Sequence, residues 1–394
     1  MKILAVSYDV PHPDQSSGEL RFCTLLSLLA RDHEVSFYSN DQQSIPERDH
    51  DLASGNLRKL GIRVERGTFE HLLRRAGFDI VIFEFYHVAE RFLDAVRTWQ
   101  PGARVIVDSV DVHFHRLRSK ARLTGLPSDH NHAETVRDHE MSVYDKADLV
   151  LTVSEEDSHI LRKEGLQSDI DVIPNIHDMH PLISHQWSDR LELIFIGSYK
   201  WAPNVDAMAY FCQEVLPLVR KRIPSLRLRI VGNAPTEEVK ALASEEVDVV
   251  GFVPETTTYL LSSDISIAPL RFGGGIKGKI GEAMAHGLPV VTTTIGAEGF
   301  GFEVGKDVLV EDTPQAFADA IEALWQDRDL YEHVRKNGWN YINDRYSVQA
   351  VDRLITPLFE RLSARRTKRL SPIRRLKNLA PHYLEKYVCW RFRG

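Results

Sequence analysis

The residues best suited to chemistry lie between residues 269 and 291, in the stretch PLRFGGGIKGKIGEAMAHGLPVV. Three consecutive glycines, Gly273, Gly274 and Gly275, separate a short apolar run from a helical pattern. Glycine adopts backbone conformations that other residues avoid. The start of a helix carries unpaired N–H groups and a partial positive charge, which together bind phosphate. We therefore predict an anion site where the glycines lead into the helix.

Two side chains on this predicted helix complement an anion. At about 100° per residue, Lys279 and Glu282 fall on one face, and another face is apolar and suits packing on a sheet. The lysine adds a cation near the phosphate, and the carboxylate can accept two hydrogen bonds from a ribose diol. Lys277 points away from the direction of Glu282 and is the weaker candidate. This order predicts a nucleotide site, with the diphosphate first and the ribose second.

Two other interpretations of the same stretch stay open. In the first, the stretch is an ordinary capped surface helix whose lysine and glutamate are solvated. In the second, the string GGGIKG is a dinucleotide-binding fingerprint of the form GxGxxG. Glu298 lies about 20 residues further on, where that fingerprint has its acid. The fingerprint normally opens the first strand–helix unit of a domain, whereas this stretch comes late in its half of the chain. An NAD enzyme is therefore the less favoured alternative.

A second candidate site lies in the first half, where DSVDVHFH, residues 108–115, ends a predicted strand with two acids and two histidines. Strand ends in open α/β sheets face the ligand crevice. A capped strand exit with solvated side chains is the plain alternative. A metal site is a third reading, although the paired histidines lack ligand-grade spacing. The residues available to it are His113, His115, His130 and His132.

Both halves alternate strand and helix patterns, which predicts an α/β protein with two doubly wound, Rossmann-like domains. A chain of 394 residues also favours two domains over one core. The expected organisation is a first domain at 1–175, a linker at 176–189, a second domain at 190–346, a returning helix at 347–363 and a tail at 364–394. The expected strands are 2–7, 34–39, 62–65, 79–85, 104–108, 149–154, 170–173, 191–197, 226–231, 247–253, 264–270, 290–294 and 308–311.

Three local expectations accompany this organisation. Residues 117–132 show no clear period and are expected to form a loop. A long helix at 204–223 is expected to be capped by Asn204. The polar linker is expected to leave its histidines solvated. These are His177, His180 and His185.

Composition limits the partners and the compartment. No run approaches 18 apolar residues, and the first residues are too short an apolar run for a signal peptide. Three widely spaced cysteines indicate a reducing cytoplasm. From Arg361 onward there are eleven Lys and Arg against the single acid Glu385, a charge of +10. The whole chain has a net charge of −7, so residues 1–360 carry a charge of −17. We expect this tail either to bind an anionic membrane surface or to be solvated; nucleic acid is not expected.

The glycine-rich stretch resembles the donor-binding segment of the retaining GT-B glycosyltransferases of family 4. Their pattern is Glu, seven residues, Glu, then AMAxGxPVV; Glu282 falls on the second Glu, and residues 283–291 follow the pattern. The first Glu would be at position 274, where this chain has Gly274, so it resembles a subgroup with a glycine-rich loop. The resemblance covers roughly residues 1–360. It implies a GT-B fold, two Rossmann-like domains facing across a cleft.

The resemblance also implies roles for individual residues. Gly18 opens a helix near the donor phosphates, and Arg21, one turn later, adds a cation. The alternative that Gly18 is an ordinary turn glycine is equally favoured. Gly197 and Lys200 stand in the place of a loop that touches the diphosphate. His113 approaches the donor sugar as the catalytic candidate, with Asp111 as its partner. The expected substrate-binding residues are Gly18, Arg21, Gly197, Lys200, Gly274, Gly275, Ile276, Lys277, Lys279 and Glu282.

The activity implied is hexosyl transfer, with retention, from a nucleotide diphosphate sugar to a glycan or lipid-linked acceptor in surface polysaccharide synthesis. No cofactor or metal is expected, and the location implied is cytoplasmic, at the inner face of the membrane. Two alternatives remain: a nucleotide-sugar epimerase of the same fold, and a non-catalytic nucleotide-sugar-binding protein, which the missing Glu at Gly274 favours.

Overall fold

The computed structural model describes residues 1–13, 17–41 and 57–364, and it contains two sheets of parallel strands. The first sheet has the order β3-β2-β1-β4-β5-β6-β7, and the second has the order β10-β9-β8-β11-β12-β13. Both orders are those of a doubly wound fold, so the predicted α/β class is confirmed. The strands of the first sheet are β1 Lys2–Ser7, β2 Glu34–Ser39, β3 Arg63–Val64, β4 Ile80–Glu84, β5 Arg104–Asp108, β6 Leu149–Thr152 and β7 Asp169–Val172. Those of the second are β8 Leu191–Ile196, β9 Leu226–Val231, β10 Val247–Gly251, β11 Ile265–Ala268, β12 Val290–Thr292 and β13 Leu309–Val310.

Helices pack on both faces of each sheet, because the strands are apolar on both sides. In β1, Ile3 and Ala5 join one core cluster, whereas Leu4 and Val6 join another. The helices of the first half are α1 Ser17–Ala30, α3 Phe69–Arg75, α4 Tyr86–Trp99, α5 His113–Thr124, α6 Pro127–Tyr144 and α7 Glu155–Lys163. Those of the second half are α8 Ala202–Tyr210, the π-helix η1 Phe211–Val215, α9 Leu216–Arg222, α10 Glu237–Lys240, α11 Thr257–Leu261, α12 Gly278–Ala285, α13 Thr294–Ala297, α14 Pro314–Gln326, α15 Arg328–Tyr346 and α16 Val348–Ala364.

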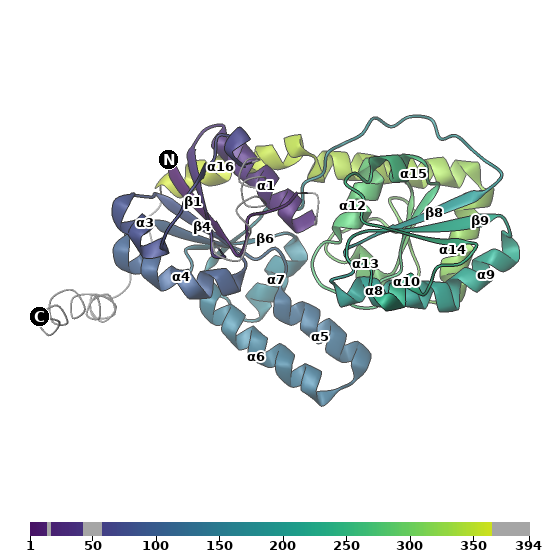
Figure 1. The fold of residues 1–394 in the computed structure, drawn as a ribbon, viewed down its shortest axis with the longest axis horizontal. Coiled ribbons are helices and arrows are strands. Elements are labelled where there is room, and N and C mark those ends of the chain that lie inside the picture. The colour runs from purple at the N-terminus through teal and green to yellow at the C-terminus, as the bar shows by residue number, and fades with distance from the viewer. Residues whose placement is uncertain (14–16, 42–56, 365–394) are drawn as a thin grey trace, which may run out of the picture.

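The loop predicted at residues 117–132 is wrong. The segment belongs to α5 and α6, a helical hairpin that projects from the first domain (Figure 1). Gly125, with φ 65°, ends α5, and Pro127 starts α6. Much of the hairpin is exposed, so its sequence carries no strong apolar stripe to reveal a helix.

The predicted cap at Asn204 is also wrong. The helix begins at Ala202, and the Asn204 amide instead donates to the Ser198 carbonyl at 2.8 Å. The helix expected over 204–223 is divided into α8, a π-helical turn and α9. Pro217 near the start of α9 removes one backbone donor, which accounts for the disturbed hydrogen-bond ladder.

The linker crosses between the domains beside the junction of α15 and α16. His177, expected to be solvated, is buried: its N–H donates to the Tyr346 carbonyl at 2.8 Å. Its ring lies so close to α12 that a Cβ on Gly281 would meet Nε2 at 2.2 Å. Burial, and then the neighbouring His286, lower the pKa of His177 to about 4. His180 and His185 are half-buried, so the expectation of solvated linker histidines is wrong for all three.

Helix α16 returns to the first domain, as Figure 1 shows along the edge of the molecule. Its apolar side joins the core around β1 and α1, and Leu354 is 46% exposed on the other side. The buried residues of α16 in that core are Val351, Ile355, Leu358, Phe359 and Leu362. The C-terminal tail that was expected to bind a membrane lies outside the described residues. Among the described residues, none of the helices combines the length and the apolar character needed to cross a bilayer.

We expect Phe359→Ala to lower the free energy of unfolding by about 3–5 kcal/mol, because it leaves a cavity in the first domain's core. Phe359 is 1% exposed and comes from the far end of the chain. Leu354→Ala on the exposed side of the same helix should change stability by about 0.5 kcal/mol or less. Urea unfolding of both variants would measure this. Equal effects would show that α16 does not belong to that core.

Candidate active site

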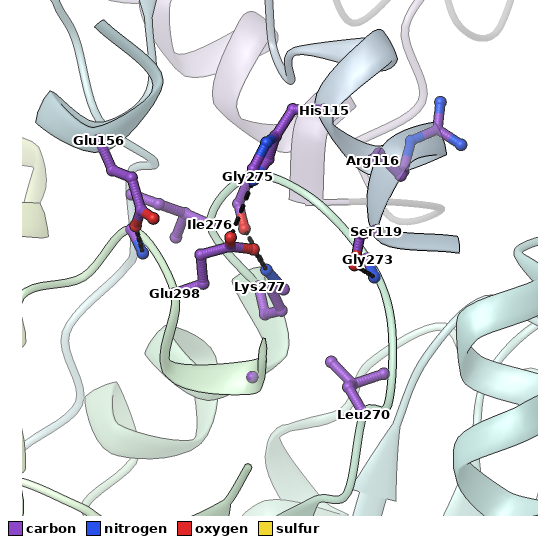
Figure 2. A network of polar contacts seen from close by, with 12 residues as sticks. His115, Arg116, Ser119, Glu156, Leu270, Gly273, Gly275, Ile276, Lys277 and Glu298 are labelled. Atoms are coloured by element: carbon purple, nitrogen blue, oxygen red, sulfur yellow. Dashed lines mark hydrogen bonds and ion pairs between the residues drawn. The ribbon is translucent and has the colours of Figure 1, made fainter. Parts of the chain in front are cut away.

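The glycine loop connects β11 to α12 and reaches across to the first domain. Gly273 has φ 156° and Gly275 has φ 62°, so two of the three glycines use left-handed backbone. The N–H of Gly273 donates to Ser119 Oγ on α5, with a donor–acceptor distance of 3.4 Å (Figure 2). Asn175 Nδ2 donates to the carbonyl of Ile276 at 3.4 Å. The predicted anion loop is thus held from both sides by the first half of the chain.

Gly274 has no room for a side chain. A Cβ at this position would lie 2.8 Å from Arg116 Cβ and 3.1 Å from its Cα, which is closer than real Cβ atoms come. A Cβ on Gly275 would lie 3.1 Å from Asp111 Cβ. The glutamate that the resembled family has at position 274 is therefore excluded by the approach of α5. Arg116 of α5 lies at the place that this glutamate would occupy, and Asp111, just before α5, lies against Gly275.

Lys279, the strongest predicted phosphate ligand, lies beside the exit of β8. Its Nζ donates to Asn204 Oδ1 at 2.8 Å and lies 5.1 Å from the centroid of the Phe195 ring. Gly197 is in the same group, packed against the Asn204 amide. Burial, and then the charge of Lys277, lower the pKa of Lys279 to about 7. A half-buried lysine without a carboxylate partner at bonding distance is suited to accept an anion.

Glu282 lies one turn after Lys279 and accepts a hydrogen bond from Thr256 Oγ1 at 2.5 Å. Burial raises the pKa of Glu282, and this effect outweighs the opposing hydrogen bond from Thr256 and the charge of Lys279. Its second oxygen remains for another donor. The face that carries Lys279 and Glu282 therefore has the order that the sequence predicts, cation first and carboxylate second.

Lys277 is held inside the protein and does not reach an open surface. Its Nζ donates to the Gly275 carbonyl at 2.7 Å and pairs with Glu298 Oε2 at 3.2 Å. The other oxygen of Glu298 lies 2.9 Å from His115 Nε2 on α5, so the three residues form one ionic link between the domains (Figure 2). Burial lowers the pKa of Lys277 even though Glu298 opposes this. The Gly299 N–H adds a bond to Glu156 on α7 at 2.8 Å.

His113 starts α5 and is held by carboxylates. Its Nε2 lies 2.8 Å from Asp111 Oδ1, and Arg116 Nε donates to the other oxygen of Asp111 at 2.8 Å. The backbone N–H of His113 donates to the buried Glu140 at 3.1 Å. Burial lowers the pKa of His113, but the Asp111 carboxylate outweighs burial and the net pKa is raised. Burial raises the pKa of Asp111, but His113 and Arg116 bring it well below its ordinary value.

Arg21 does not lie where the sequence placed it. It is fully buried: NH1 pairs with Asp108 Oδ2 at 2.6 Å, and NH2 donates to the Ile173 carbonyl at 2.8 Å. The arginine therefore ties α1 and β5 to the chain directly after β7, and its side chain is not exposed for a diphosphate. The local sequence around an arginine one turn into a helix does not distinguish a buried structural ion pair from a phosphate ligand.

The remaining predicted residues are divided between two places. Gly18 is half-buried in the first turn of α1, where a Cβ would meet Val110 Cγ1 at 3.4 Å. Lys200 is exposed and lines a cavity of about 600 Å³ beside α8, together with Arg271. Phe272, next to the glycine loop, also lines that cavity, whereas Lys279 does not.

Sequence reasoning missed several residues of this site. Ser119 lies in the segment predicted as a loop, Arg116 lies just before that segment, and Asn204 was taken for a helix cap. Glu298 was noticed only through the dinucleotide fingerprint, where its role would have been different. Among the described residues, no group of three or more His, Cys, Asp or Glu is arranged to hold a metal ion.

We expect Glu298→Gln to destabilise the protein by about 3 kcal/mol, because breaking a buried pair leaves the Lys277 cation without its counter-charge. The side chains of Lys277 and Glu298 are 6% and 17% exposed. Glu303→Gln removes the exposed partner of Lys306 and should cost about 0.5 kcal/mol or less. Urea unfolding compares the two; matching losses would mean that the link between the domains does not contribute.

Binding of a nucleoside diphosphate should take up protons above pH 7. Lys279 has a pKa of about 7 in the free protein, so it loses its proton as the pH rises through this value. A bound diphosphate favours the charged lysine, so binding restores the proton and affinity falls as the pH rises further. Calorimetry at pH 8 in buffers of different ionisation enthalpy measures the uptake. Lys279→Ala should abolish it, and an unchanged uptake would assign the proton to another group.

Comparisons with known proteins bear on the family and the fold. Residues 190–327 match the family model described as "Glycosyl transferases group 1". Over 385 residues the chain is 22% identical to an "uncharacterized 44.6 kDa protein in cps region" of Klebsiella pneumoniae, covering 89% of this chain and 97% of that protein.

Two solved structures show the same architecture. Sucrose-phosphate synthase of Thermosynechococcus elongatus is 15% identical with a TM-score of 0.69, covering 92% of this chain and 100% of that chain. HepE of Anabaena, solved with UDP and glucose, is 16% identical with a TM-score of 0.68, covering 91% and 99%. The chain thus has the GT-B fold, two Rossmann-like domains, and its second domain matches the group 1 glycosyl transferases.

Proposed function

We propose that the protein transfers a hexosyl group from a nucleotide diphosphate sugar to a glycan or lipid-linked acceptor, with retention of the anomeric configuration. The observation that carries this proposal is the shared face of α12, where Lys279 and Glu282 follow a glycine loop that touches α5 of the other domain. The donor is held by the second domain, and the acceptor is brought by the first.

The chemistry required is stabilisation of the leaving diphosphate. Backbone N–H groups of the loop, the positive end of α12 and Lys279 supply positive charge where negative charge develops. Glu282 accepts hydrogen bonds from the ribose and fixes the donor. The glycine loop contacts Ser119 and Arg116 of α5, so the two domains meet beside the proposed donor site, where closure on the donor would exclude water.

His113 is the group of the first domain that we assign to the donor sugar. Its ring is fixed by Asp111, and Asp111 packs against Gly275 of the donor loop. Since Asp111 Oδ1 lies 2.8 Å from Nε2, the carboxylate fixes the orientation of the His113 ring. In this role His113 contacts the donor sugar and holds it in place while the bond between the sugar and the diphosphate breaks.

Two relatives support the biological setting. HepE was solved with UDP and glucose, which are the parts of a nucleotide sugar. The Klebsiella relative is described as a protein in a cps region, which is consistent with surface polysaccharide synthesis. A cytoplasmic enzyme whose basic tail binds the inner face of the membrane would meet lipid-linked acceptors there.

The test is product analysis. The protein is incubated with UDP-, GDP- and ADP-sugars and with glycan and lipid-linked acceptors, and the configuration of any new glycosidic bond is read by NMR. A retained configuration supports the proposal. An inverted product refutes retention, and an altered sugar from donor alone would identify an epimerase. Donor binding without turnover on any acceptor would identify a binding protein.

Glu282→Ala should weaken donor binding by about 1.5–3 kcal/mol, since it removes hydrogen bonds to a charged group. Calorimetric titration with the nucleotide selected above measures the loss. Glu303→Ala changes an exposed carboxylate of the same domain and serves as the control. Equal donor affinity in all three proteins would remove Glu282 from the ribose.

A further inference from the structure

A cluster of aromatic rings lies at the carboxyl edge of the first sheet, outside the residues used so far. Tyr8 follows β1, Phe85 and Tyr86 follow β4, and His87 lies in the first turn of α4. The rings of Phe85 and His87 stack at 5.3 Å with an angle of 17°, and Tyr8 meets His87 edge-on at 6.4 Å. Tyr8 is 53% exposed, His87 is exposed, and Phe85 is half-buried. Together they present aromatic surface at the edge where open sheets bind ligands.

The backbone at this edge is strained. Phe85 has φ 68° and ψ 148°, a region that is essentially reserved for glycine, and β-branched Val110 at the neighbouring strand exit has φ 59°. Such conformations persist where the surrounding structure requires them. Here the strain places a phenyl ring at the strand exit, where a glycine would adopt the same backbone without cost.

The cluster is continuous with the donor loop. The His113 ring lies 5.8 Å from Phe85, 5.2 Å from Tyr86 and 6.0 Å from His87. Asp111 joins His113 to Gly275 on the other side. A molecule lying on the rings would therefore reach the donor loop past His113.

Carboxylates outnumber cations around Tyr86. Glu140, Glu90 and Asp111 act on its ring, and the positive groups there are Arg116 and, when protonated, His113, whose ring lies 5.2 Å away. This field disfavours a phosphate or a carboxylate on the bound molecule. Carboxylates and tyrosine hydroxyls, however, form hydrogen bonds with sugar hydroxyls. The faces of aromatic rings pack against the apolar C–H face of a pyranose.

We propose that Tyr8, Phe85 and His87 form a stacking subsite for a neutral pyranose ring of the acceptor. The inference rests on the proposed glycosyl transfer and makes it more specific, because the group that receives the sugar is then itself carried on an uncharged sugar ring. The subsite also separates the acceptor's sugar from any charged lipid carrier, which must lie elsewhere.

Saturation-transfer NMR on the full chain tests the subsite. The probes are methyl glucopyranoside and methyl galactopyranoside, with methyl glucuronoside and decyl phosphate as charged comparisons. We expect transfer to the ring C–H protons of at least one neutral glycoside. Tyr8→Ala and Phe85→Gly should weaken its binding on the order of tenfold, since each removes a stacking ring. Leu126→Ala, at the tip of the α5–α6 hairpin and also 53% exposed, should leave it unchanged.

Phe85→Gly also guards against misfolding, because glycine accepts the observed φ and the variant should be no less stable to heat. The subsite is refuted if no neutral glycoside binds, if both variants bind it as the native protein does, or if a charged probe binds more tightly. Calorimetry with UDP, GDP and ADP should show unchanged nucleotide binding in both variants. If no nucleotide binds the native protein while the glycoside results hold, the proposed transfer fails and the subsite stands.

Discussion

The contact between the glycine loop and α5 decides how the two domains meet. At Gly274 the backbone of one domain lies against the backbone of the other with no space for a Cβ, and at Gly275 the space is barely larger. Close approach of this kind is available only to glycine. The loop can therefore bring its N–H groups, and with them the start of α12, directly to the strand exits of the first sheet. The two domains can meet this closely because Gly274 and Gly275 have no side chains.

The charges of the cleft are arranged around this contact. Lys277 is used internally, bonded to Gly275 and Glu298, and through Glu298 it reaches His115 on α5 (Figure 2). Lys279 points to the other side, toward Asn204 and the exit of β8. Two lysines separated by one residue thus have different partners: Lys277 bonds within the loop and to Glu298, whereas Lys279 bonds to Asn204. The sequence shows both as cations near a glycine loop, and the ranking of Lys279 above Lys277 as the phosphate ligand stays a prediction.

Much of the fold was predictable because parallel strands buried on both faces leave long apolar runs. The bounds expected for β2, β5 and β9 agree with the structure. The predictions that were wrong concern single polar residues and a mostly exposed segment. The α5–α6 hairpin has little apolar surface, so neither helix leaves a clear periodic signal, and the residues it carries into the site, Arg116 and Ser119, could not be foreseen. Arg21 was misplaced since a buried ion pair with Asp108 depends on tertiary contacts that no local pattern records.

The chain crosses between its domains twice, and both crossings lie at one place. The linker and the α15–α16 junction are joined there by the bond from the His177 N–H to the Tyr346 carbonyl and by a bridge between His177 and Ser347. Both covalent connections therefore pass through one small region. Any change in the angle between the domains has to be absorbed there, by backbone rotation in the linker and at the start of α16. Substitutions at this region, far from the glycine loop, are thus placed to alter how the domains close.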